Sequence, residues 1–239
     1  DDVELLLGVI AGADPMDPVS VPVPLVLPER RTNRVALMAE IPDVDVDPRV
    51  SEIIRAASRA LAETGVTIVE TIPPQWGDVI SCWSTLVLGG LDPQDPGGAE
   101  MIVGDVVGEF LVTAATFAAE RGLVSPTHGW GMRHYLQREW ELWFADFDAV
   151  LTPVWTGRPF AADADLNGTE GADLTLNMLR TVMPGNVLGL PSAAVPAGLA
   201  DGLPVGALLT GPLWSDLRML ELAKSIEATL APKTPINPQ

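Results

Sequence analysis

Short apolar runs recur along this chain, and those at residues 149–151, 193–195 and 205–209 are bounded by proline or glycine. The runs lie at residues 34–38, 66–69, 149–151, 193–195 and 205–209. Runs of this length that end at turn-forming residues are typical of β-strands buried in a sheet. The pattern therefore predicts five strands, although the core of any α/β domain would show a similar one.

Between these runs, apolar residues recur at helical spacing. The helices predicted from this spacing cover residues 1–10, 48–65, 78–88, 100–120, 127–144, 173–182 and 216–230. Asp47 is expected to cap the second of them, with Pro48 in its first turn. Ser215 or Asp216 is expected to cap the last. The strand, helix and strand over residues 34–69 predict a right-handed parallel crossover, and the chain as a whole is predicted to be α/β.

The chain is strongly acidic. Its 239 residues include 32 Asp and Glu against 14 Lys and Arg, a net charge of −18. Nucleic acids and anionic membranes are bound through clusters of basic side chains, which this chain lacks. No apolar run approaches the roughly 18 residues of a spanning helix. We therefore expect no nucleic acid and no membrane as partners, while a mean hydropathy of +0.25 indicates a substantial folded core.

The helix predicted over residues 127–144 is rich in aromatic side chains. They are Trp130, Tyr135, Trp140, Trp143 and Phe144. Stacking on nucleic-acid bases is one use of such a stripe. Because acidic residues interleave with the rings and no basic patch accompanies them, packing in the core is the favoured interpretation.

Familiar catalytic and metal-binding motifs are absent from the sequence. There is no G-x-S-x-G elbow, no H-E-x-x-H and no glycine fingerprint for a dinucleotide, so neither a cofactor nor a metal is expected. His128 and His134 are six residues apart, which does not place them on one helix face, and surface or capping roles are favoured for both. The single cysteine, Cys82, and the lack of a basic segment at the N-terminus predict a cytoplasmic protein.

Several segments, in order, resemble one enzyme family. They are DDVELLLGVIAG (1–12), RVAL (34–37), FDAVLTP (147–153), NVLGLPSAAVPAG (186–198) and DGLPVGALLTG (201–211). Together they resemble the part of an amidase signature hydrolase that follows the glycine/serine-rich catalytic signature. The resemblance implies a single C-terminal region over residues 1–239. It divides into a linking helix and extended segment (1–33), a βαβ unit with a helical substrate-side region (34–148), and core strands with a final helix (149–239).

The resemblance also has implications for fold and catalysis. It implies part of a mixed, largely parallel sheet covered by helices, incomplete without an N-terminal half. Enzymes of the family use two serines and a neutral lysine, and neither the signature nor the lysine segment has a counterpart here. Of the two lysines, Lys224 is expected to be ion-paired with Glu221 and Glu227, and Lys233 lies in a proline-rich tail. No catalytic residue is therefore assigned to this chain.

The resemblance places five residues at a substrate pocket. They are Thr152 and Trp155 at the pocket mouth, and Leu179, Met183 and Asn186 along its wall. A tryptophan and a methionine there suit an apolar or aromatic acyl group. Packing of all five in the core is the alternative interpretation.

The expected function is that of the C-terminal portion of an amidase, which hydrolyses carboxylic amides through an acyl-enzyme. The expected partners are the N-terminal catalytic half of a split or processed enzyme, as a separate chain or removed segment, and a small-molecule amide substrate. The alternatives are a non-catalytic domain that binds a small ligand and a structural α/β domain.

Overall fold

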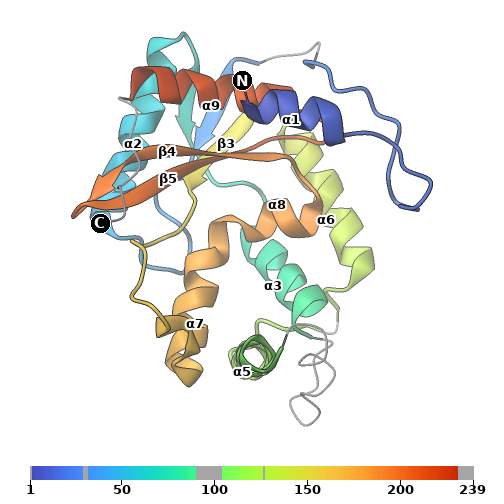
Figure 1. Cartoon of the computed structure of the whole chain (residues 1–239), viewed down its shortest axis with the longest axis vertical. Helices are drawn as coiled ribbons and strands as arrows, with labels where there is room; N and C mark the ends of the chain where they lie inside the picture. The colour runs from blue at the N-terminus through green and yellow to red at the C-terminus, as the bar shows by residue number, and fades with distance from the viewer. Residues whose placement is uncertain (1, 29–31, 90–103, 126, 231–239) are drawn as a thin grey trace.

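The computed structural model of the chain describes residues 2–28, 32–89, 104–125 and 127–230. Figure 1 shows a sheet with helices on both faces. The helices are α1 (Asp2–Ile10), α2 (Pro48–Glu63), α3 (Trp76–Val87), α5 (Asp105–Glu120), α6 (Trp130–Trp143), α7 (Gly168–Met178), α8 (Met183–Leu188) and α9 (Asp216–Thr229), with 3₁₀-helices η1 (Ala164–Leu166) and η2 (Leu179–Thr181). The strands are β1 (Arg34–Leu37), β2 (Thr67–Glu70), β3 (Ala149–Pro153), β4 (Ser192–Ala200) and β5 (Leu203–Thr210).

The five strands described form one sheet in the order β2-β1-β3-β5-β4. β1 pairs in parallel with both β2 and β3, whereas β5 pairs antiparallel with both β3 and β4. The predicted α/β class, a mixed sheet covered by helices, is confirmed. Within the described residues its pairings are evenly divided between parallel and antiparallel.

The two faces of the sheet follow from the alternation of side chains along the strands. Val35 and Leu151 pack with α2 and α9 on one face, and Ala36 and Val150 pack with α3, α6 and α8 on the other. β3 is buried at every position because it lies in the middle of the sheet. The residues that leave its C-terminal end are therefore held on a rigid base.

Several helix boundaries follow the predicted signals and others do not. The Asp47 side chain caps α2 by accepting a hydrogen bond from the Arg49 backbone N–H, and Pro48 opens the helix. Ser215 occupies the N-cap of α9, but its hydroxyl donates to the Pro212 carbonyl instead of capping the helix. The helix predicted over residues 173–182 was wrong in its bounds, because α7 begins at Gly168 and tightens into η2 after Met178. Residues 1 and 100–103 of two predicted helices lie outside the described residues.

The aromatic side chains of α6 divide between core and surface. Trp140 is fully buried, stacks on Trp76 with ring centroids 6.2 Å apart, and contacts Phe144. The core interpretation was wrong for Trp130 and Tyr135, which are exposed. Their ring faces instead lie under the guanidinium groups of Arg133 and Arg138 of the same helix.

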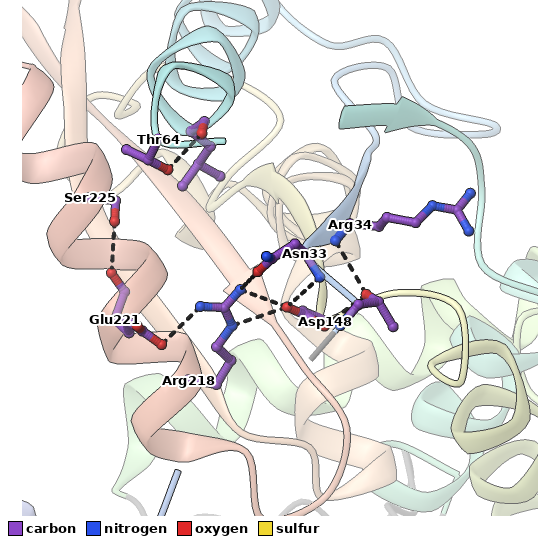
Figure 2. Close-up of polar contacts among 9 residues, drawn as sticks. Asn33, Arg34, Thr64, Asp148, Arg218, Glu221 and Ser225 are labelled. Atoms are coloured by element: carbon purple, nitrogen blue, oxygen red, sulfur yellow. Dashed lines mark hydrogen bonds and ion pairs between the residues drawn. The ribbon is translucent and has the colours of Figure 1, made fainter. Parts of the chain in front are cut away.

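A buried ion pair joins the beginning of β3 to α9 (Figure 2). The Asp148 carboxylate accepts from Arg218 Nη2 at 2.6 Å, and from the Thr32 backbone N–H and hydroxyl at 2.6 and 2.7 Å. Arg218 also donates to Asn33 Oδ1 and to Glu221. Three segments far apart in the sequence therefore meet at one charged group. Within the described residues, no helix is both long enough and apolar enough to cross a membrane.

Candidate functional site

The candidate site begins where β3 leaves the sheet. Thr152 is buried, and its hydroxyl donates to the Pro153 carbonyl at 3.0 Å. The next residue, Val154, continues the pairing with β5, because its N–H donates to the Gly206 carbonyl at 3.0 Å. Residues 155–160 then run over the surface as a loop. Trp155 is therefore the first side chain of this loop and is only partly buried.

An apolar cavity of about 460 Å³ lies beside Trp155. Its walls come from the loop after β3 and from the β4–β5 hairpin: Val154, Trp155, Gly157, Pro159, Ala194, Val195, Pro196, Pro204, Val205 and Gly206. None of these side chains carries a charge or a hydroxyl. The Trp155 ring lies 5.4 Å from that of Phe160, which stiffens the loop side of the cavity. The cavity can accept an apolar group, and its walls contain no acid, base or nucleophile.

Two arginines fix the cavity loop to neighbouring elements. Arg158 donates to Asp47 at the beginning of α2 and to Asp201 in the β4–β5 turn, both at 2.8 Å. Arg49 contacts the same two carboxylates. The hydrogen bond from the Arg49 backbone is the largest of the contacts that lower the pKa of Asp47, which keeps this carboxylate charged. The loop and the hairpin tip are thus held at a fixed separation.

Leu179 and Met183 lie on the turn and helix that pack beneath the end of β3. The Thr181 hydroxyl donates to the Val154 carbonyl at 2.6 Å, which attaches η2 to the residue before Trp155. Met183 is buried in the core, and Leu179 packs against the same cluster. Neither side chain lines the apolar cavity. Leu179 and Met183, two of the three predicted wall residues, therefore pack in the core next to the end of β3 and do not line the cavity.

Asn186 lies on the exposed side of α8. Its Oδ1 accepts a hydrogen bond of 2.7 Å from the indole N–H of Trp83 on α3. Of the five predicted residues, Trp155 alone lines the apolar cavity, and Thr152 and Trp155 share one strand end. Trp83 was missed by the sequence analysis, because nothing in a local pattern relates a tryptophan to an asparagine 103 residues away.

The backbone of α8 is fixed at several points. Arg133 Nε donates to the Val187 carbonyl at 2.5 Å, and Gln137 Nε2 donates to that of Leu188 at 2.7 Å. Both side chains come from α6 and satisfy carbonyls at the C-terminal end of α8. Gly185 lies so close to β4 that a Cβ atom there would be 2.8 Å from Ser192 Oγ. A short helix of six residues is thereby held rigidly on the sheet.

The chain's histidines and its described lysine lie away from this site. His128 Nε2 is 3.3 Å from Asp78 Oδ1, and His134 is exposed on α6. Lys224 forms a surface ion pair, as expected, and one partner, at 2.7 Å, is Glu4 of α1, which the sequence analysis did not name. Lys233 lies outside the described residues. Among the residues that the structure describes, no three acidic, histidine or cysteine side chains are grouped so as to hold a metal.

Comparisons with known proteins agree with this architecture. The amidase family matches residues 128–220. An indoleacetamide hydrolase of Bradyrhizobium diazoefficiens is 30% identical over 95% of this chain and 44% of its own length. A glutamyl-tRNA(Gln) amidotransferase subunit of Streptococcus equi subsp. zooepidemicus is 28% identical over 94% of this chain and 51% of its own length. The chain spans about half the length of the curated relatives it matches.

Among solved structures, a glutamyl-tRNA(Gln) amidotransferase subunit of Thermotoga maritima superposes with a TM-score of 0.70 at 20% identity. The superposition covers 96% of this chain and 50% of that one. At this identity the likeness concerns the fold. With the sequence matches, it confirms the resemblance to the C-terminal part of amidase signature enzymes.

Proposed function

Since residues 128–220 of this chain match the amidase family, we propose that it is the C-terminal portion of an amidase that hydrolyses carboxylic amides through an acyl-enzyme. In this reaction a serine Oγ attacks the amide carbonyl, the amine leaves with a proton, and water then releases the acid and restores the serine. The chain shapes the pocket for the acyl group. The two serines and the lysine belong to a segment or chain that is not part of this sequence.

The observation that carries the proposal is the apolar cavity against Trp155. Its volume of about 460 Å³ lies within the range of small-molecule sites, roughly 300 to 1,000 Å³. Its uncharged walls favour an apolar or aromatic acyl group over a charged one. A relative at 30% identity is named for the hydrolysis of indoleacetamide, whose acyl group is aromatic and apolar. We therefore propose arylacetamides as the substrate class.

The exposed position of Lys224, beside an acidic side chain, supports a catalytic base elsewhere. A lysine that takes a proton from serine must be neutral, which requires removal from water and from acidic neighbours. Lys224 is 42% exposed in its side chain and its Nζ lies 2.7 Å from the Glu4 carboxylate, so neither condition is met at this position. The candidate cavity contains no histidine, acid or lysine that could act instead.

The exposed apolar side chains of α1 support the proposal that a further segment or chain packs on this helix. None of the helix's residues is buried, and Leu5, Val9 and Ile10 are 72%, 76% and 69% exposed. In Figure 1 this helix lies beside α9, where the Lys224–Glu4 ion pair joins the two. Large exposed apolar surfaces mark interaction sites. We propose that the N-terminal half of the enzyme, as a separate chain or removed segment, covers α1.

A role in amide-bond formation on transfer RNA, suggested by the name of the amidotransferase relatives, is less well supported. Phosphate backbones are bound by clusters of Lys and Arg. This chain carries a net charge of −18. Any contact with RNA would therefore have to come from the other half.

The test is the denatured intact mass of every polypeptide in the purified folded protein, followed by an assay of amide hydrolysis. We expect either a longer single chain, or a second chain beside the 25.3 kDa one, that contains a glycine/serine-rich signature. The same sample should release ammonia from indoleacetamide. A single monomeric 25.3 kDa species without hydrolytic activity would contradict the proposal and favour a non-catalytic domain that binds a small ligand.

A further inference from the structure

We propose that Ala194 limits the size of the acyl group that the apolar cavity accepts, an inference that rests on the proposed amidase function. Ala194 lies on β4, at an edge of the described sheet, where it is exposed and lines the cavity. Strand positions favour β-branched and aromatic side chains, which cover the pleated surface, whereas alanine covers little of it. The small side chain therefore leaves room for an apolar group against the sheet.

The strand register places Ala194 on the same face of the sheet as the end of β3. Residues directly opposite each other in antiparallel strands share one face. Ala194 is opposite Leu208 of β5, and Leu208 is opposite Thr152 of β3. The next row on this face pairs Pro196 with Gly206, and both line the cavity. Ala194, Pro196 and Gly206 thus form the floor of the cavity, on the face to which Thr152 belongs.

The other hairpin residues around the cavity have little freedom to set its size. Val195 and Val205 are buried in the cluster that packs with α2 and α9 on the opposite face, so they border the cavity with their backbone. A Cβ atom at Gly206 would lie 2.8 Å from Val154 Cγ2. A side chain at Gly206 would therefore collide with Val154 before it reached the cavity.

The loop after β3 forms the other side of the cavity. A Cβ atom at Gly157 would lie 3.5 Å from Met178 Cε, which directs this position toward α7. The prolines of the wall have rigid rings that fix the backbone. Among the described residues that line the cavity, Trp155 and Ala194 are therefore the two whose side chains face it and can change in size. Trp155 is already large, so Ala194 controls the remaining space.

A larger side chain at Ala194 should discriminate between substrates by size. Leucine would place a branched alkyl group in the space that the ring of an arylacetamide needs. The acyl group of acetamide ends in one methyl group, so it loses little when the floor is raised. The effect of such a substitution on kcat/KM should therefore depend on the acyl group.

The experiment uses the complete enzyme with the variants A194V and A194L, and with L199F as a control. Leu199 lies on the same strand, is exposed and does not line the cavity. Valine is a favoured strand residue, so A194V should fold even if leucine is poorly tolerated. The readouts are kcat and KM for indoleacetamide and acetamide, and the melting temperature.

A binding measurement without turnover accompanies the kinetics. The probe is 3-methylindole, which has the ring of indoleacetamide but no amide to hydrolyse. Its Kd is measured by calorimetry for each variant. The NMR resonance of the Ala194 methyl group, assigned by its absence in A194L, reports whether the ring lies against the floor in the wild-type enzyme.

We expect A194L to lower kcat/KM for indoleacetamide about 10- to 200-fold more than that for acetamide, with A194V between wild type and A194L. L199F should leave the ratio between the two amides unchanged. The Ala194 methyl resonance should shift when 3-methylindole is added, and A194L should bind this probe about tenfold more weakly than the wild type.

Two results would overturn the inference. The first is an A194L or A194V enzyme that keeps the wild-type ratio between the two amides, including one that loses activity on both equally. The second is the absence of any shift of the Ala194 methyl resonance with 3-methylindole, even if the wild-type enzyme hydrolyses indoleacetamide. A wild-type enzyme that shows this shift and binds the probe more tightly than A194L, but hydrolyses neither amide, would contradict the proposed function while supporting the role of Ala194 in the cavity.

Discussion

Arg218 and Asp148 form an ion pair whose side chains are only 7% and 5% exposed. Asp148 immediately precedes β3, and Arg218 lies in the first turn of α9. Arg218 also donates to Asn33, beside the beginning of β1 (Figure 2). Since β3 ends at the candidate site, this pair helps to set the position of the strand that carries Thr152. In a buried ion pair, the attraction between the two charges offsets the free-energy cost of removing them from water. Removal of one partner leaves the other charge buried without a counter-charge, which destabilises the folded state.

Replacement of Asp148 by Asn should therefore destabilise the fold strongly. The variant leaves the Arg218 guanidinium buried without its full counter-charge, which typically costs about 3–5 kcal/mol. Glu221→Gln is the matched control, because it removes an exposed partner of the same arginine and should cost less than about 1 kcal/mol. Urea denaturation of both variants measures the free energy of unfolding. Equal losses in the two variants would contradict the prediction.

Asp148 should also make the free energy of unfolding depend on pH in the acidic range. Burial by itself would raise the pKa of this carboxyl, but hydrogen bonds from Thr32 and the pairing with Arg218 outweigh it, so the pKa is lowered in the folded state. The unfolded chain then takes up the proton first as the pH falls. The stabilisation should be fully present well above the unfolded pKa of about 3.9, and should be lost as the pH falls through that value toward the folded pKa.

The measurement is the difference in unfolding free energy between wild type and Asp148→Asn at a series of pH values from 7 to 3. Taking the difference removes the contribution of the other acidic residues. We expect this difference in unfolding free energy to be constant near pH 7 and to decrease below about pH 4. A difference that stays constant down to pH 3 would show that the Asp148 pKa is not lowered by folding.

Trp155→Ala should change the substrate preference of the complete enzyme. The variant removes the largest wall of the apolar cavity, so an aryl acyl group loses contacts that a small aliphatic group never makes. We expect kcat/KM for indoleacetamide to fall about 10- to 200-fold more than that for acetamide. Trp214→Ala, at an exposed tryptophan outside the cavity, is the control. Equal losses on both amides would indicate a general loss of stability.

Gly185→Ala should lower stability through one contact. The added methyl group would lie 2.8 Å from Ser192 Oγ, so that hydroxyl must rotate out of its hydrogen bond with Thr210 or α8 must shift away from β4, at a cost of about 1–3 kcal/mol. Removal of that hydroxyl by Ser192→Ala should recover part of the loss, although it also removes the hydrogen bond to Thr210. A double-mutant cycle followed by thermal unfolding measures the coupling. Strictly additive effects would show that this contact does not hold α8 in place.

The sequence predicted the parts of the fold that depend on neighbouring residues. The run at residues 149–151, ended by Pro153, became the buried strand β3. The Asp47–Pro48 pair began α2. Such features are local, because a strand's alternation, a helix cap and a proline act within a few residues. The family resemblance also follows from short segments kept in order, and it placed Trp155 at the candidate site.

Tertiary structure decided which of these residues meet. Ala194 and Pro196 could be read as strand residues, but their contribution to a cavity with Trp155 depends on how the β4–β5 hairpin pairs with β3. The Trp83–Asn186 hydrogen bond joins residues 103 positions apart. Contacts over such distances depend on the packing of whole elements, which no local pattern encodes. The sequence by itself therefore determined the strands, the start of α2 and the resemblance to the amidase family, whereas the shape of the cavity and the orientation of Asn186 were determined by packing.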